Sequence, residues 1–269
     1  MRRPARRPSR FPTVEVPFNP THLADCRLWL DSSDTNYLYQ EITAPGTTLA
    51  NADNDPVGTL RDRSKNGHHF SATANGNRAL VDINNNKGKL IFDGSNDFYT
   101  GPTIANATGA CTFAISWKFR TTPAPTGGSI FLLKTSSTTW TEFVVINASG
   151  YGYQEITWSC DTTATVPIAS VGCGGGLNTS AHRAVITYNG SGNGTPGNYT
   201  ILLDGSSQTV VAGGAFIRQS TDLTSLGGRW DGSTLTNSRE LNFDCVAHWS
   251  GVKTTEQIAQ IDAWLLNHP

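Results

Sequence analysis

One segment near the C-terminus carries the residues best suited to catalysis. Glu240-Leu-Asn242-Phe-Asp244 alternates acidic or amide side chains with apolar ones. Residues two apart in a strand share a face, so the three polar side chains are expected on one face and the other face is expected to carry Leu241, Phe243 and Cys245. Two carboxylates roughly 5–5.5 Å apart on one face can cleave a glycosidic bond, one as nucleophile and one as acid. Asn242 cannot titrate, however, and Asp244 is one methylene shorter than a glutamate. We therefore predict that the chain is not an enzyme.

Aromatic residues beside glycine-rich turns form a second set of candidates, for binding. An exposed ring can stack on a sugar face while a neighbouring carboxylate or amide binds the hydroxyls. We favour the interpretation that most of these rings belong to the core or fill the edge of the sandwich, and glycan binding stays as the alternative. The candidates for glycan binding are Tyr151, Tyr153, Trp158, Arg229, Trp230 and Asp231.

Short acidic runs could supply oxygen ligands to calcium, but they also fit turns. Asp53-Asn-Asp55 resembles the first half of an EF-hand loop, yet the twelfth position is Ser64 instead of the bidentate Glu that calcium requires. An acidic surface loop is therefore expected there. In the run Asp93-Gly-Ser-Asn-Asp97, Asp and Asn are equally expected for turn geometry. No cofactor is predicted, and calcium stays as an alternative at Asp93, Asn96 and Asp97.

Residues 1–20 are predicted to form an extended anchoring arm. The first ten residues hold five Arg and no acid, and prolines recur through the segment, so a helix is disfavoured. The rest of the chain has 15 basic and 21 acidic residues, a balance of −6, which disfavours a nucleic-acid-binding face on the body. The arm could dock onto an acidic protein lattice, contact nucleic-acid phosphates, or be a solvated tail. We favour docking, through Arg2, Arg3, Arg6, Arg7, Arg10, Phe11, Val14, Val16 and Phe18.

The elements that must position these residues are mostly strands. Only 15% of the chain is charged, and 27 Gly and 13 Pro argue against a mainly helical protein. Cys111–Phe119 alternates apolar and polar residues, which predicts a half-buried antiparallel strand. The other predicted strands are 129–134, 141–147, 153–159, 182–188, 198–204, 207–211 and 240–249. Strands and turns spaced in this way predict an all-β sandwich.

One helix is predicted, over 254–267. Thr254 and Gln257 form a capping-box pattern, and Ile258, Ile261 and Leu265 then follow on one face. No apolar run approaches the ~20 residues of a membrane span, and the Arg-rich start leads into no signal-peptide core. The five cysteines are scattered, odd in number and without a C-x-x-C pair, so we expect free thiols and synthesis in a reducing cytoplasm.

Three segments together resemble the opening of concanavalin A-like (laminin G-like) jelly-roll domains. They are Leu28-Trp-Leu-Asp31, Arg61-Asp-Arg-Ser-Lys-Asn-Gly67 and Phe92-Asp-Gly-Ser-Asn-Asp97. The end is similar too, with Leu226-Gly-Gly228, a last long strand and a terminal helix. The resemblance covers about residues 25–267 and implies one jelly-roll sandwich over 21–269. Glycoside hydrolases of this fold use a Glu-x-Asp-x-Glu strand, from which this chain departs at Asn242 and Asp244.

The resemblance also suggests a context, because such domains are common in bacterial surface proteins and bacteriophage virion proteins. With a basic arm and no hydrolase or zinc motif, the chain is expected to be a non-enzymatic virion structural protein. It would be a phage capsid decoration or head-associated protein, made in the host cytoplasm, displayed on the virion surface and docked by its arm. Expected partners are capsid or tail subunits and further copies of itself, with no membrane. The alternative is a glycan-binding adhesin of a tail or head fibre that binds host surface polysaccharide.

Overall fold

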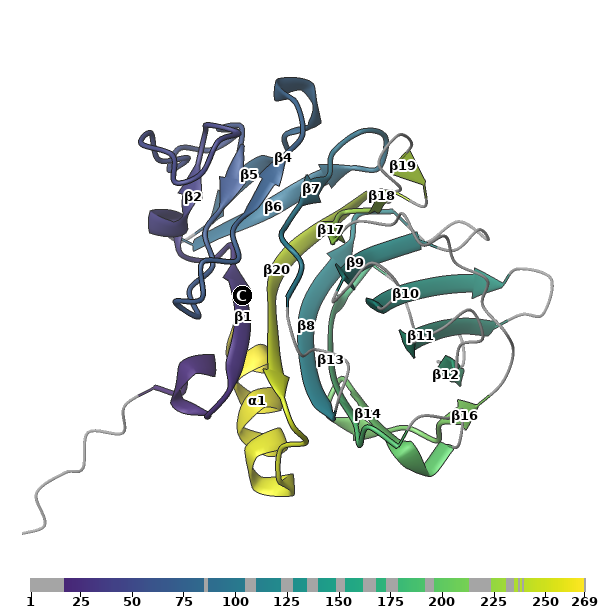
Figure 1. Cartoon of the computed structure of the whole chain (residues 1–269). Helices are drawn as coiled ribbons and strands as arrows, with labels where there is room; N and C mark the ends of the chain where they lie inside the picture. The colour runs from purple at the N-terminus through teal and green to yellow at the C-terminus, as the bar shows by residue number, and fades with distance from the viewer. Residues whose placement is uncertain are drawn as a thin grey trace, which may run out of the picture.

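In the part of the chain that the structure describes, two antiparallel sheets face each other, a separate two-stranded hairpin lies beside them, and one α-helix lies outside the first sheet (Figure 1). The computed structural model describes residues 17–84, 87–104, 110–121, 128–134, 140–148, 153–161, 168–172, 179–191, 196–212, 224–230, 235–236, 238 and 240–268. Within these ranges the predicted β-sandwich with one C-terminal helix is confirmed. No helix in the same ranges is long and apolar enough to cross a membrane.

The first sheet has eight strands, and its centre joins segments distant in the sequence. β8 (Cys111–Phe119) pairs with β20 (Glu240–Ser250) along nearly its whole length. On the other edge of β20, β6 (Lys87–Asp93) pairs with Glu240–Phe243 and β1 (Cys26–Asp31) pairs with Cys245–Trp249. Asp244 therefore lies where β6 gives way to β1. The outer strands are β5 (Leu80–Asn84) beyond β6, and β13 (Ala181–Tyr188), β14 (Tyr199–Leu203) and β15 (Ser206–Ser207) beyond β8.

The second sheet has ten strands, several of them only two residues long. Its order is β16 (Val211–Ala212), β12 (Ile168–Gly172), β11 (Tyr153–Asp161), β10 (Trp140–Ala148), β9 (Gly128–Lys134), β17 (Ser225–Leu226), β7 (Tyr99–Thr100), β4 (Phe70–Ala72), β3 (Thr59–Leu60) and β2 (Leu38–Tyr39). A separate hairpin joins β18 (Arg229–Trp230) to β19 (Leu235–Thr236). Short 3-10 turns are η1 (Pro20–His22), η2 (Thr35–Tyr37), η3 (Asn75–Asn77) and η4 (Pro196–Asn198).

The Leu226-Gly-Gly228 motif marks a close approach between the two sheets. Gly227 has φ +88°, and a Cβ there would lie 2.2 Å from Cε1 of Phe92. A larger residue would therefore collide with a fully buried ring as well as adopt a strained backbone. The glycine lets the second sheet pack against β6.

The helix α1 (Thr255–Asn267) begins as the sequence predicts. The side chain of Thr254 accepts from the backbone N–H of Gln257, and Oε1 of Gln257 accepts from the backbone N–H of Thr254 at 2.9 Å. Ile261 and Leu265 are buried, Ile258 is partly buried, and Trp264 joins them. The capping box and the apolar face together place α1 against β8 and β13.

Two apolar cores follow from this arrangement. The main core lies between the sheets and includes Leu28, Leu30, Phe92, Tyr99, Phe113, Trp117, Phe131 and Phe243. The second core lies between α1 and the outer face of the first sheet and includes Trp29, Ala114, Val185, Cys245, Trp249 and Trp264. Each buried aromatic side chain stabilises the fold by about 2–3 kcal/mol relative to exposure.

Because of the second core, β8 is buried on both faces. The alternation of Cys111–Phe119 predicted a half-buried strand, which is wrong: Thr112 and Ser116 are buried, and within the strand only Lys118 is exposed. The row with Phe113 and Trp117 faces the second sheet, while α1 covers the other row. The small residues on that row allow the helix to pack closely against the strand. Because some of them are polar, the sequence alone predicts an exposed row.

A bulge at Asp244 changes which residues of β20 face inward. Phe243 pairs with Trp117, but Cys245 pairs with Ser116, so β20 has one extra residue relative to β8. Beyond the bulge, Val246 continues the inward row and Cys245 turns to the second core. The expectation that Cys245 shares a face with Leu241 and Phe243 is therefore wrong.

Candidate functional site

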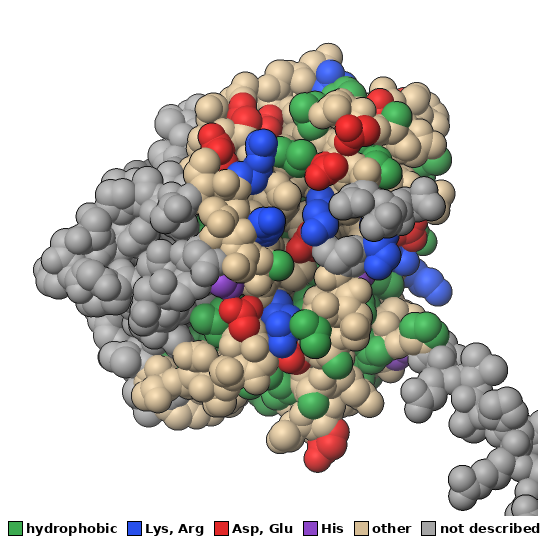
Figure 2. Space-filling view, turned by 180° about the vertical axis from the view of Figure 1, so that it is seen from behind, with side chains coloured by type: hydrophobic (Ala, Val, Ile, Leu, Met, Phe, Trp, Pro, Cys, Tyr) green, Lys and Arg blue, Asp and Glu red, His purple; other side chains and the backbone are tan. Residues whose placement is uncertain are grey.

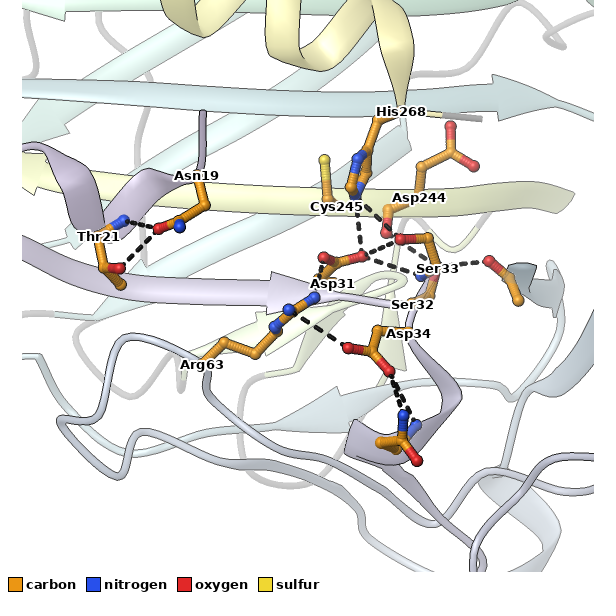
Figure 3. Close-up of polar contacts among 12 residues, drawn as sticks. Asn19, Thr21, Asp31, Ser32, Ser33, Asp34, Arg63, Asp244, Cys245 and His268 are labelled. Atoms are coloured by element: carbon orange, nitrogen blue, oxygen red, sulfur yellow. Dashed lines mark hydrogen bonds and ion pairs between the residues drawn. The ribbon is translucent and has the colours of Figure 1, made fainter. Parts of the chain in front are cut away.

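A buried carboxylate at the end of β1 is the centre of the polar cluster in Figure 3. The side chain of Asp31 is 1% exposed and accepts from Ser33 Oγ at 2.6 Å. His268, directly after α1, places Nε2 2.8 Å from Asp31 Oδ1. Arg63, from the loop between β3 and β4, forms an ion pair with Asp31 Oδ2. We call these four residues the Asp31 cluster; they join β1, the 61–67 loop and the end of α1.

The electrostatics of the Asp31 cluster keep its carboxylate charged. Burial alone would raise the pKa of Asp31, but the hydrogen bond and charge of His268, then Arg63 and Ser33, hold it below its ordinary value. The Arg63 guanidinium lies 4.0 Å from the Trp29 ring and 4.5 Å from the Tyr37 ring. The carboxylate is thus saturated by its own neighbours, and its role is to hold elements together.

Asp62 organises the second motif in the same way. Its carboxylate accepts from the backbone N–H groups of Trp29 at 3.0 Å, Ser64 at 2.8 Å and His68 at 3.0 Å. The turn that it closes contains Gly67 at φ +77°. Asp31, Asp62 and Arg63 belong to the motifs that carry the family resemblance. Their hydrogen bonds and ion pairs therefore hold the loops around β1 in place.

The carboxylates of β20 lie in unlike surroundings. Glu240 is exposed, whereas the side chain of Asp244 is 4% exposed and its Oδ1 has no hydrogen-bond partner among the described residues. Burial raises the pKa of Asp244 to about 6, opposed by Lys89, whose Nζ lies 3.7 Å away, and by His268. A glycosidase needs both carboxylates to reach one substrate. Only Glu240 of this pair is open to solvent.

One open depression of ≈ 470 Å³ lies elsewhere, and no predicted site residue lines it. It is formed by the loop 41–47 and Asn75. The Glu41 carboxylate closes this loop by accepting from Thr47 and Thr48, and these bonds, that of Thr48 first, lower its pKa to about 2. The carboxylate in this depression is therefore already engaged within its own loop.

The acidic runs act as turn formers. The backbone N–H of Ile83 donates to Asp53 Oδ1 at 3.2 Å, so the 53–55 run covers the edge of β5, and the expected acidic surface loop is confirmed. Asp93 Oδ1 accepts from the backbone N–H groups of Ser95 at 2.8 Å and Asn96 at 3.1 Å, and Asp97 Oδ2 accepts from that of Asp93 at 2.9 Å. These oxygens serve their own turn, and no group of three or more His, Cys, Asp or Glu in the described residues could hold a metal ion.

The glycan-binding candidates fall on two separate elements. Tyr151 and Asp231 lie outside the described residues. Tyr153 and Trp158 belong to β11, while Arg229 and Trp230 form β18. β18 lies against β9, so β9 and β10 stand between the two groups (Figure 1). The backbone therefore does not bring all six candidates into one patch.

Most candidates of the N-terminal arm also lie outside the described residues: Arg2, Arg3, Arg6, Arg7, Arg10, Phe11, Val14 and Val16. Phe18 is described, and its ring centroid lies 6.3 Å from that of Trp264 on α1. Two residues later, the carbonyl of Pro20 accepts from Trp249 Nε1 at 2.9 Å. The described N-terminal segment is thus packed onto α1 and β20.

Charge on the described surface is mixed. Figure 2 shows Lys and Arg side chains interspersed with Asp and Glu over the face opposite to that of Figure 1. A nucleic-acid interface normally gathers basic residues on one face. The described part of this face carries no such single-sign patch.

Comparison with known proteins supports the fold. No protein-family model matches the chain, and no curated protein matches its sequence. The binding domain of Botulinum neurotoxin DC, solved with rat synaptotagmin II, is similar with a TM-score of 0.53 at 10% identity, over 92% of this chain and 52% of that one. An arabinofuranosidase complexed with arabinofuranosyl-alpha-1,2-xylobiose has a TM-score of 0.52 at 13% identity, over 90% of this chain and 62% of that one.

These structural similarities define the fold class of the chain. The chain has a concanavalin A-like jelly-roll β-sandwich and spans about half the length of the neurotoxin chain that it matches. Because the similar structures include an enzyme and a binding domain, the fold does not choose between catalysis and recognition.

Proposed function

We propose that the chain is a non-enzymatic virion structural protein, a phage capsid decoration or head-associated surface protein of laminin G-like type. Its N-terminal residues would dock it to neighbouring virion subunits. The packing of Phe18 and Pro20 on α1 and β20 carries this proposal, since it gives the Arg-rich segment a fixed base on the body.

The layout of the molecule supports an anchor on one side and a display surface on the other. The described chain begins at the α1 side of the first sheet, and β10, β11 and β12 lie on the far side (Figure 1). Five Arg in the first ten residues would be attracted to acidic subunits, and Phe11, Val14 and Val16 would add apolar contact.

The polar sites of the body support a role without catalysis. The Asp31 cluster is saturated by its own ion pairs, and the β20 strand offers a single exposed carboxylate. If the purified chain released reducing sugar from β-glucans and Glu240→Gln abolished this activity, the proposal of a non-enzymatic protein would be wrong.

A binding experiment tests the docking role. Virions assembled without this chain are mixed with the wild-type chain or with a full-length variant in which Arg2, Arg3, Arg6, Arg7 and Arg10 are Gln, and co-sedimentation is measured. We expect saturable binding of the wild type that falls with rising salt and a loss of at least about tenfold in affinity for the variant. A variant with Lys65→Gln and Lys118→Gln is the control for charge loss on the body. Equal binding of all three chains would contradict docking through the arm.

Glycan binding is the second candidate function, favoured by the SialylT complex of a structurally similar protein. The same neurotoxin binding domain was solved in complex with SialylT, with a TM-score of 0.50 at 10% identity, over 91% of this chain and 52% of that one. By this hypothesis the chain is an adhesin that uses Trp230 or the β11 aromatics on host polysaccharide. Binding on a glycan array that is lost in Trp230→Ala, with Trp158→Ala as the parallel variant, would favour it over the structural role.

A further inference from the structure

A histidine is buried in the sandwich without a hydrogen-bond partner. His248 lies on β20, in register with Leu28 of β1 and Phe113 of β8. Its exposed fraction is 0%, and neither ring nitrogen has a hydrogen-bond partner in the described part of the chain. An unpartnered buried polar group is costly, and a charged one is far more so. The site therefore tolerates only the neutral ring.

The charged groups around His248 strengthen this preference. They are Arg27 on β1, His68 in the loop before β4 and Lys253 in the link to α1, all cationic or able to become so. The nearby acids are engaged with these cations: Asp25 lies 3.8 Å from Arg27, and Asp62 lies 3.9 Å from His68. Burial first, then these three groups, lower the pKa of His248 from 6.5 to about 3.

The residues that hold the N-terminal segment follow this histidine directly in the sequence. Trp249 Nε1 donates to Pro20 O at 2.9 Å, and the Ser250 N–H donates to Asp25 O at 3.1 Å. Arg27 Nε donates to Ser250 Oγ at 2.9 Å, and Lys253 Nζ donates to Ala24 O at 2.8 Å. We call these contacts between residues 20–27 and 249–253 the N-terminal clasp. Two of its cations, Arg27 and Lys253, would repel a protonated His248.

We propose that His248 is an acid-sensitive switch beneath the N-terminal clasp: a proton on its ring opens the clasp and frees the segment from which the arm departs. The switch is a property of the folded chain, and its use, to change how the arm is held on a virion, rests on the proposed function. The sign follows from linkage, because the open state binds a proton near pH 6.5 and the closed state only near pH 3. Closure is therefore fully stable above pH 6.5 and weakens as the pH falls toward 3. Between pH 7 and pH 5 the opening equilibrium should rise about 25-fold.

Amide hydrogen exchange on the full chain tests the switch. Protection factors for residues 20–27, corrected for intrinsic exchange rates, are compared at pH 7 and pH 5. We expect a fall of about 25-fold in the wild type and less than about threefold in His248→Leu. His182→Leu is the matched control, since His182 is also buried but has Asp204 as a partner at 2.9 Å, and it should keep the wild-type response. No pH response in the wild type, or an equal response in His248→Leu, would overturn the proposal.

A second measurement needs no variant. Exchange of the C2 hydrogen of each histidine, followed by mass spectrometry, gives the pH at which that ring titrates. We expect a midpoint below 5 for His248, and a midpoint above 6 would overturn the switch. Both measurements use the free chain, so they can fail or succeed independently of virion binding.

Discussion

At the scale of single residues, the described carboxylates named above serve mainly to hold loops and turns by accepting hydrogen bonds. Asp31 and Asp62 accept several hydrogen bonds each, and Asp93 does the same for the backbone of its own turn. Asp53 accepts from the backbone N–H of Ile83 on β5. A carboxylate in a turn offers two oxygens with about four acceptor positions, enough to satisfy several N–H groups at once. This use accounts for the acidic residues of these turns through the N–H groups of the chain itself.

Asp31→Asn should be strongly destabilising. It removes the negative charge that Arg63 and His268 share, and breaking a buried pair costs about 3 kcal/mol in free energy of unfolding. The folded pKa of Asp31 lies below its ordinary value of 3.8, so the stabilisation is present above that pH and is lost as the pH falls through the folded pKa. Urea unfolding at pH 7 and pH 3 measures both effects. Asp25→Asn, at an exposed ion pair with Arg27, should change stability by less than about 0.5 kcal/mol; a similar loss in the two variants would contradict the special role of Asp31.

Asp244→Asn should have the opposite effect. Because burial raises the folded pKa of Asp244 from 3.8 to about 6, ionisation weakens the fold as the pH rises from about 4 to 6. The amide should therefore raise the free energy of unfolding by about 2–3 kcal/mol at pH 7 and change it little at pH 4. Glu240→Gln on the same strand, where the side chain is exposed, is expected to be neutral at both pH values. A loss of stability for Asp244→Asn at pH 7 would mean that its ion pair with Lys89 outweighs the cost of burial.

At the scale of elements, local patterns predicted local features. The predicted strands other than 207–211 appear within two residues of their expected bounds, and the helix begins at the residue that its capping box indicates. The predicted strand 207–211 is wrong, because β15 and β16 divide this segment between the two sheets. The predicted burial of β8 and the predicted face of Cys245 were wrong because segments distant in the sequence determine both. α1 covers the second face of β8, and the change of partner from β6 to β1 coincides with the bulge at Asp244. Neither the covering helix nor the bulge produces a periodic pattern in the sequence. β12 and the two-residue strands are too short to show a periodic pattern. The Asp31 cluster was missed for the same reason, because its members are far apart in the sequence.

The capping box gives the element-scale prediction. Thr254→Ala removes the side chain that accepts the Gln257 N–H, and it should lower the free energy of unfolding by about 1 kcal/mol. Gln257→Ala should cost part of the same amount, and the double variant should cost less than the sum, since the two bonds are reciprocal. Gln260→Ala, on the exposed face of α1, is the control and should be within about 0.5 kcal/mol of the wild type. Thermal unfolding followed by circular dichroism measures all four; additive losses would contradict a cooperative box.

At the scale of the whole molecule, charge and packing divide the N-terminal region at different residues. The five Arg end at residue 10, whereas described contacts with the body begin at Phe18 and continue with the buried Pro20. The segment was predicted as one arm from residue 1 to 20, because its prolines and its low apolar content run through to Pro20. Contacts with Trp264 and Trp249, more than 200 residues away, cannot be seen from that composition. The last residues of the predicted arm thus also belong to the packing of the body.

This division can be tested by truncation. Removing residues 1–16 should leave the melting temperature within about 2 °C of the wild type, since the described contacts are all retained. Removing residues 1–23 takes away the ring on Trp264, the acceptor of Trp249 Nε1 and the buried Leu23, and should lower the melting temperature by at least about 5 °C. Phe18→Ala in the full chain separates the packing of the ring from the loss of chain and should fall between the two. Equal melting temperatures for both truncations would show that residues 17–23 do not stabilise the fold. The arm would then have no fixed base on the body, which would contradict docking through the arm.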